Sequence, residues 1–282
     1  MAAIWGASFP LIRSSVSAFG PAWLIEGRLA LGALALAVFC LSQRRVFAFR
    51  RNWRHFLVLG IINSAFPFLC FGYAAQTFSA SLLSIFNAST PIFAGLLGVF
   101  WLKRKVSTLG WMGMLVGVAG VALIGLEGIA VKGENTVLAL VACLLAPVSY
   151  SYASLYTTHY SKDVHPLDNA HGSLWVGAAL LLPLAAGSPA AIRVPEFSDW
   201  AAIVTLGLLC TSFAYLLFYR LLLDMGPVKA LSVTFLIPLF GIFWAWLFLG
   251  EQITHTMWIG GALVLLGSAL IHGVFEKKAA DA

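Results

Sequence analysis

The chain has 282 residues, of which 61% are hydrophobic and only 10% are charged, and its formal net charge is +6. Ordinary soluble domains carry about 25% charged residues, so this composition excludes a water-soluble globular protein. The positive charge does not indicate nucleic-acid binding, because the basic residues are spread over several short connections instead of gathering on one soluble surface.

Ten apolar stretches follow one another along the chain. A helix that crosses a bilayer needs about 20 apolar residues. The stretches run over 2–18, 21–42, 54–76, 80–101, 108–127, 136–157, 168–187, 199–221, 228–249 and 254–274. We therefore expect an all-α integral membrane protein with ten transmembrane helices. No basic segment precedes the first stretch, so we do not expect a signal peptide.

The connections between these stretches alternate in charge. Every second connection is basic, while the others contain only Lys132 and Arg193. This is the positive-inside pattern, which predicts that both termini lie in the cytoplasm. The basic residues of the predicted cytoplasmic connections and tail include Arg44, Arg45, Arg50, Arg51, Arg54, Lys103, Arg104, Lys105, Lys162, Lys229, Lys277 and Lys278.

The second half of the chain repeats the first. Residues 91–111, PIFAGLLGVFWLKRKVSTLGW, align without a gap with residues 238–258, PLFGIFWAWLFLGEQITHTMW. Pro91 and Pro238 match at an offset of 147, but the basic residues 103–105 have no basic counterpart. Five spans are an odd number, so a second copy enters the membrane upside down and its matching loop is external. The loss of the positive charges therefore follows from topology.

The repeat predicts the domain organisation and the class of protein. We expect a first five-helix unit over residues 1–130 and an inverted unit over residues 135–282 that ends in a short cytoplasmic tail. Inverted repeats of this kind are typical of secondary transporters, in which the two halves exchange roles as the site opens to either side.

Three stretches resemble a known family. The opening IWGASFPLIR, the segment TFSASLLSIFNASTPIFAGLLGVFWL, and FLGEQIT before a glycine-rich last stretch resemble the drug/metabolite transporter superfamily of the EamA-domain type. Within it, the chain is most similar to bacterial aromatic amino-acid exporters of the YddG type. The resemblance implies a five-plus-five inverted repeat around a central cavity in the bacterial inner membrane, and export of amino acids or small drugs. Many members have Gly-Glu at the position of residues 103–105, where this chain has Lys-Arg-Lys. Any role that the family gives to this glutamate can therefore hold here only in the second copy, at Glu251.

Two prolines predict where the substrate binds. Sites in inverted-repeat transporters lie near the bilayer midplane, where helices are interrupted. Pro91 and Pro238 lie at the middle of the fourth and ninth stretches, and each frees the carbonyl four residues earlier, those of Asn87 and Thr234. We expect Asn87, Thr90 and Thr234 to line the cavity and to accept hydrogen bonds from a substrate ammonium group. The alternative is that these groups only repair the kinks.

Aromatic side chains are the second indication of a cavity, because they can stack an aromatic solute or hold an organic cation. An interfacial belt is the alternative, which we prefer for the tryptophans near span ends. For Trp5, Tyr150 and Tyr215 the cavity assignment leans on the family resemblance. The candidates for the cavity wall are Trp5, Phe9, Tyr150, Trp175, Tyr215 and Tyr219, with Ser212 on the side of the last two and a further kink at Pro147.

Arg28 is a charged residue about 10 Å inside the second stretch at 1.5 Å per residue. It can attract a substrate carboxylate, or it can have a structural role and bond to carbonyls of neighbouring helices. We favour the structural role, because long side chains can reach the membrane interface from that depth. Gly113 and Gly117, with Gly260 and Gly267, predict close helix packing within the monomer.

Other classes of protein find less support. The six histidines fall near span ends, and there is no HExxH or GxSxG motif, so a membrane-embedded enzyme lacks a catalytic constellation. Cys40, Cys70, Cys143 and Cys210 lie far apart inside the stretches, and we expect packing residues without metal, disulfide or cofactor. A multidrug, organic-cation or other metabolite exporter is the alternative among transporters. The expected partners are a small-molecule substrate and membrane lipid but no nucleic acid, and the protein is expected to work as a monomer.

Overall fold

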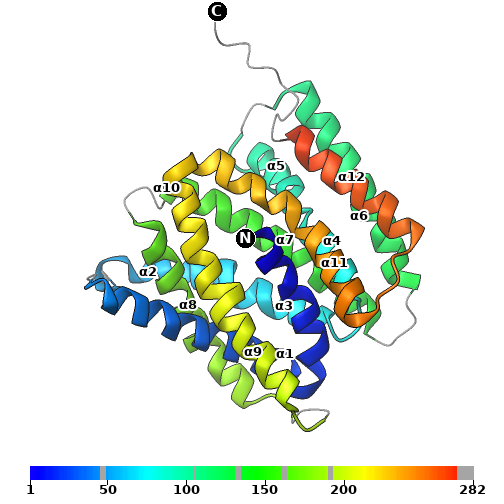
Figure 1. The fold of residues 1–282 in the computed structure, drawn as a ribbon. Helices are drawn as coiled ribbons and strands as arrows, with labels where there is room; N and C mark the ends of the chain where they lie inside the picture. Colours follow the sequence, from blue (N-terminus) through cyan, green and yellow to red (C-terminus); the bar gives the residue numbers. More distant parts are fainter. Residues whose placement is uncertain (45–48, 104–105, 131–134, 161–163, 190–192, 272–282) are drawn as a thin grey trace, which may run out of the picture.

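The computed structural model describes residues 1–44, 49–103, 106–130, 135–160, 164–189 and 193–271, and all regular structure in these ranges is helical (Figure 1). The predicted cytoplasmic tail after residue 271 and the basic loop residues 104–105 lie outside them. The α-helices are α1 (Ala2–Ser42), α2 (Phe49–Leu59), α3 (Phe66–Ala74), α4 (Ala80–Asn87), α5 (Thr90–Phe100), α6 (Thr108–Ala130), α7 (Thr136–Tyr160), α8 (Pro166–Ala186), α9 (Phe197–Gly207), α10 (Ala214–Ser232), α11 (Ile237–Leu249) and α12 (His255–Ile271).

Many of these helices are long and apolar enough to cross a membrane. Within the described residues there are six such helices when segments that join end to end are counted together, and two shorter apolar helices at 233–249 and 255–271. The prediction of an all-helical membrane protein is therefore confirmed, while the ten crossings stay a prediction. Helix α8 is not among the six, and its first turns contain Asp168, Asn169 and His171.

A proline or a glycine marks several of the breaks between helices, but not every proline interrupts a helix. Gly20 has φ 72° and divides α1, as the sequence predicts. Pro91 lies in the first turn of α5, after a break at residues 88–89. The predicted turn at 222–227 is instead helical, and α10 ends only before a 3-10 turn at Val233–Leu236, because Pro238 cannot donate to the carbonyl of Thr234. At Pro147, by contrast, α7 continues without interruption.

Two π-helical turns occur at similar places in the two halves of the chain. They span Gly60–Ala65, between α2 and α3, and Leu208–Phe213, between α9 and α10. In the second turn, Thr211 Oγ1 donates to the carbonyl of Leu206 at 2.8 Å, which is five residues back. A π turn places an extra residue in one helical turn and often marks a functional site.

The starts of α6 and α12 are related by the offset of the sequence repeat. Thr108 and His255, their first residues, are 147 positions apart. Each helix has an equivalent N-cap, in which the hydroxyl of Ser107 or Thr254 accepts from a backbone N–H at 3.2 and 3.1 Å.

Helices α6 and α12 lie side by side at one edge of the molecule (Figure 1). Their backbones approach so closely that a Cβ atom at Gly267 would lie 2.5 Å from the carbonyl oxygen of Gly113, and one at Gly120 would lie 2.8 Å from that of Gly260. Glycine allows this approach because it has no side chain. The predicted role of these glycines in packing within one chain is confirmed.

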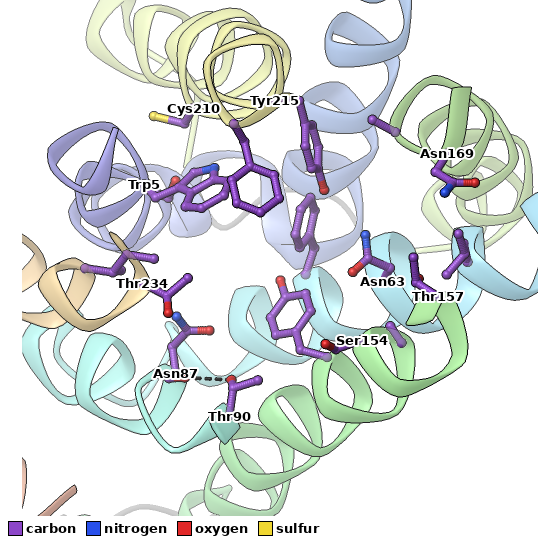
Figure 2. A pocket seen from close by; sticks show the side chains of 18 of the residues that line it. Trp5, Asn63, Asn87, Thr90, Ser154, Thr157, Asn169, Cys210, Tyr215 and Thr234 are labelled. Atoms are coloured by element: carbon purple, nitrogen blue, oxygen red, sulfur yellow. Dashed lines mark hydrogen bonds between the residues drawn. The ribbon is translucent and has the colours of Figure 1, made fainter. Parts of the chain in front are cut away.

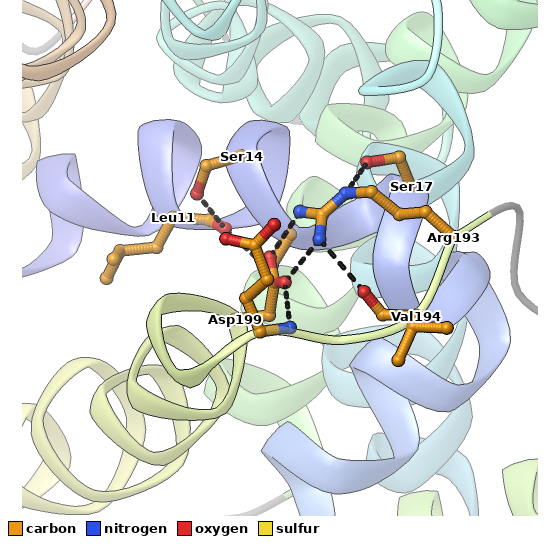
Figure 3. A network of polar contacts seen from close by, with 8 residues as sticks. Leu11, Ser14, Ser17, Arg193, Val194 and Asp199 are labelled. Carbon is orange, nitrogen blue, oxygen red and sulfur yellow. Dashed lines mark hydrogen bonds and ion pairs between the residues drawn. The ribbon is translucent and has the colours of Figure 1, made fainter.

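Polar contacts join segments at the end of the bundle that the charge pattern predicts to be external. Arg193 donates to both carboxylate oxygens of Asp199 at 2.6 Å and reaches Ser17 in α1 at 3.4 Å (Figure 3). This pairing raises the pKa of Arg193, chiefly through the hydrogen bond to Asp199. Glu251 accepts from the backbone N–H groups of Ala80 and Ser81 at 2.7 and 2.9 Å, so it caps the start of α4.

Candidate functional site

A cavity of about 540 Å³ lies in the middle of the helix bundle, a size suited to a small organic molecule. Figure 2 shows part of its wall. The lining residues come from α1, α2, α3, α4, α5, α7, α8, α10 and α11, from both π-helical turns and from residues 234–235. No described residue of α6, α9 or α12 lines it. The α6–α12 pair therefore supports the bundle from outside the site.

Aromatic rings form much of this wall. Phe9 meets Phe71 edge-on, with ring centroids 5.6 Å apart, and Phe71 lies nearly parallel to Tyr150 at 6.4 Å. Trp5 packs against Tyr215 and also against Phe218, at 6.5 and 5.5 Å. These rings come from α1, α3, α7 and α10, so the fold assembles an apolar, stackable surface from four separate helices.

The interruption before Pro91 brings amide and hydroxyl groups to the cavity. Asn87, the last residue of α4, and Thr90, the first of α5, both line it. Thr90 Oγ1 donates to the main-chain carbonyl of Asn87 at 2.7 Å, so this carbonyl is not free as the sequence predicts (Figure 2). The side-chain amide of Asn87 makes no hydrogen bond within the described part of the chain and remains directed to the cavity.

Arg28 provides the charge of the cavity wall. Its Nε donates to Thr211 Oγ1 at 3.0 Å, and its guanidinium carbon lies 3.9 Å from the centre of the Phe68 ring. Only 6% of the residue is exposed. Thr211 in the second π-helical turn holds the side chain, which is a structural contact with a hydroxyl group, and Arg28 also lines the cavity.

The cavity reaches the surface at one end of the bundle. Pro166, at the start of α8, lines the cavity and is exposed, and Thr158 and Leu222 line it nearby. Tyr219 lies at this end, where its hydroxyl is 2.7 Å from Nε2 of His165. The connection between α7 and α8 at this end is one of those that the charge pattern predicts to be cytoplasmic.

Most of the predicted cavity residues are brought together. The cavity is lined by Trp5, Phe9, Arg28, Asn87, Thr90, Pro91, Tyr150, Tyr215, Tyr219 and Thr234. Two predicted positions lie elsewhere. Trp175 is 37% exposed and donates to His171, and the hydroxyl of Ser212 donates to the carbonyls of Gly32 and Gly207 within the helix packing. Pro238, which was predicted as a helix kink, lies in the first turn of α11 and is buried.

Several lining residues were not predicted. Asn63 lies in the first π-helical turn next to Tyr215, and Ser154, Thr157 and Asn169 add polar groups from α7 and α8 (Figure 2). Asn63 precedes Pro67 by four residues, so the rule that identified Asn87 from Pro91 identifies Asn63 as well.

These features define a multi-pass helical membrane protein with an internal cavity that reaches one end. The sequence profile of the EamA-like transporter family matches residues 1–126 and again residues 137–273, and the chain belongs to this family. It is therefore a transporter of the drug/metabolite superfamily.

Individual relatives are distant but match along most of the chain. The uncharacterised transporter YdfC of Bacillus subtilis is 24% identical over 95% of this chain and 87% of its own length. A probable terminal-alkyne amino-acid exporter of Streptantibioticus cattleyicolor is also 24% identical, over 95% of this chain and 89% of its own. A protein of known crystal structure, 19% identical, matches 100% of this chain and 96% of its own with a TM-score of 0.70, which shows a similar fold.

Proposed function

We propose that this transporter exports amino acids, aromatic ones among them, from the bacterial cytoplasm by alternating access. The observation that carries the proposal is the cavity of about 540 Å³, whose aromatic wall can stack a side chain while Asn87 and Thr234 offer oxygen atoms to an ammonium group. The name of the Streptantibioticus relative, an amino-acid exporter, supports the same class of substrate.

The mechanism rests on the two halves of the chain exchanging roles. We take residues 1–130 and 135–282 as inverted five-helix units that together make ten crossings, with both termini in the cytoplasm of a bacterial cell and one chain as the working unit. The matching N-caps of α6 and α12 and the two π-helical turns support a repeated architecture. The described conformation then faces inward, because the cavity reaches the end with the basic connections.

At the opposite end, tight packing separates the cavity from the surface. Phe78 and Ala80 are almost fully buried there, and Glu251 fastens the start of α4 to the connection between α11 and α12. Export requires this end to open while the other closes.

Uptake of labelled phenylalanine into liposomes that contain the purified protein tests the proposal. We expect uptake above that of empty liposomes, inhibited by excess tryptophan but not by an unrelated sugar. An organic-cation exporter, which the aromatic wall also suits, would instead take up a labelled aromatic cation and ignore phenylalanine. That result would overturn the amino-acid assignment.

A further inference from the structure

We propose that Arg28 binds the carboxylate of the transported solute, so that the cavity selects organic acids and zwitterions and rejects organic cations. This inference rests on the proposed function, because it concerns the same cavity, and it names the chemical group that a substrate must carry.

The first argument is the charge balance of the cavity. Among the described residues that line it, Arg28 is the only charged side chain, and no aspartate or glutamate is present. The ionisable groups that interact with it are Tyr150, Tyr215 and Cys210, none of which is a carboxylate. A buried cation without a counterion is costly in a low-dielectric interior. A ligand carboxylate would remove that cost.

The second argument is the part of the guanidinium group that remains available. Nε is bonded to Thr211, and one face of the group lies over Phe68. The two terminal nitrogens have no hydrogen-bond partner in the described part of the chain. A guanidinium group held at Nε can still present both terminal nitrogens, and arginine binds carboxylates with two parallel hydrogen bonds.

Glu26 does not neutralise Arg28. The two residues are two positions apart on one helix, so their side chains point about 200° apart. Glu26 is buried, its Oε2 has no partner among the described residues, and no ion pair joins it to Arg28. It does not line the cavity either.

Further polar groups line the same cavity as the guanidinium group. Ser8 lines the cavity, and its buried hydroxyl lies close to the thiol of Cys210. Asn63 lies near the hydroxyl of Tyr215. These groups come from α1, the first π-helical turn and α10, and they can donate to a carboxylate beside Arg28.

The direct test compares three ligands that share a phenyl ring. Melting of the purified protein in detergent is measured with rising concentrations of phenylalanine, of 3-phenylpropionate, which lacks the amine, and of phenethylamine, which lacks the carboxylate. We expect the first two to stabilise the protein and phenethylamine to have no effect. Comparable stabilisation by phenethylamine, or none by 3-phenylpropionate, would overturn the proposal.

Variants assign the effect to Arg28. We expect Arg28→Gln to weaken 3-phenylpropionate binding at least tenfold, and Arg28→Lys to weaken it severalfold, because lysine keeps the charge but not the paired geometry. The matched control is Arg13→Gln, since Arg13 also belongs to α1 but bonds to the carbonyl of Ala75, outside the cavity. Unchanged binding in Arg28→Gln would contradict the proposal. If that variant does not fold, the ligand comparison in the unmodified protein still decides.

The possible results distinguish a failure of this proposal from a failure of the proposed amino-acid export. Stabilisation by 3-phenylpropionate but not by phenylalanine would support the carboxylate site and overturn amino-acid export. Phenylalanine uptake that persists at an equal rate in Arg28→Gln would support export and overturn the carboxylate site.

Discussion

Asn87 illustrates how a single break in a helix exposes a polar group at mid-depth. Pro91 removes a hydrogen bond of the helical ladder, Thr90 satisfies the main-chain carbonyl of Asn87, and the side-chain amide is left facing the cavity. Repair of the kink therefore uses the main chain of Asn87, and its side chain remains for the binding role that we propose.

We predict that Asn87→Ala lowers the affinity for phenylalanine. The loss of one hydrogen bond is worth about 0.5–1.5 kcal/mol, or about 2- to 12-fold. Thr234→Ala should have a similar effect. Competition with labelled phenylalanine on the purified protein measures both. Asn135→Ala is the matched control, because Asn135 is exposed and does not line the cavity. Affinities of both cavity variants equal to that of the control would contradict the assignment.

The spacing from a proline predicts some of the lining residues, whereas the direction of Ser212 could not be predicted from the sequence. The rule that a proline frees the carbonyl four residues earlier locates Asn87 and, if applied to Pro67, Asn63. A π turn rotates the following residues relative to an α-helix. Ser212, inside the second turn, is therefore directed at Gly32 in α1, although its spacing from Tyr215 predicts the cavity.

Helices α6 and α12 are in close backbone contact. We predict that Gly267→Ala destabilises the protein by about 1–3 kcal/mol, the usual cost of overpacking. The new Cβ atom would lie 2.5 Å from the carbonyl oxygen of Gly113, which belongs to the backbone and cannot rotate away.

The melting temperature in detergent measures this effect. Gly125→Ala in α6 is the control, because a Cβ atom there meets only a Leu140 methyl group at 4.0 Å. We expect the control to melt at or slightly above the temperature of the unmodified protein, since alanine favours helix. Equal melting temperatures for the two variants would refute the packing argument.

Glu251 ties two elements together at the end opposite the cavity opening. We predict that Glu251→Ala lowers stability by about 1.5–3 kcal/mol, because buried N–H groups at the start of α4 lose a charged acceptor. Gln252→Ala, at an exposed neighbouring position, should leave the melting temperature unchanged. The idea fails if both variants melt alike.

At the level of elements, the apolar stretches and the prolines predicted helices and some of their ends. The turn predicted between the eighth and ninth stretches is not present. The sequence places a turn at 222–227, yet the helical backbone continues to Ser232. Local composition does not determine where α10 ends. The helix ends shortly before Pro238, whose nitrogen cannot donate a hydrogen bond to the carbonyl of Thr234. The helical class and the repeated apolar frame, in contrast, depend on patterns that extend over the whole chain.

For the whole molecule, the central prediction of topology is that equivalent positions of the two halves face opposite sides. Thr108 and His255 are equivalent and both exposed at the starts of α6 and α12. With a cysteine at either position, an impermeant maleimide should label residue 255 in intact cells and residue 108 only after the cells are opened. The four native cysteines are buried and provide a low background. Labelling of both positions from the same side would contradict the inverted repeat.

Alternating access in the cavity is the claim on which the whole account depends, and counterflow tests it most directly. Liposomes that contain the protein are loaded with unlabelled phenylalanine and diluted into a trace of labelled phenylalanine. We predict that the label enters faster than into unloaded liposomes and transiently exceeds equilibrium, because each return of the loaded site exchanges one solute for another. Entry of the label at the same rate with and without internal phenylalanine would contradict alternating access and indicate a channel or a leak.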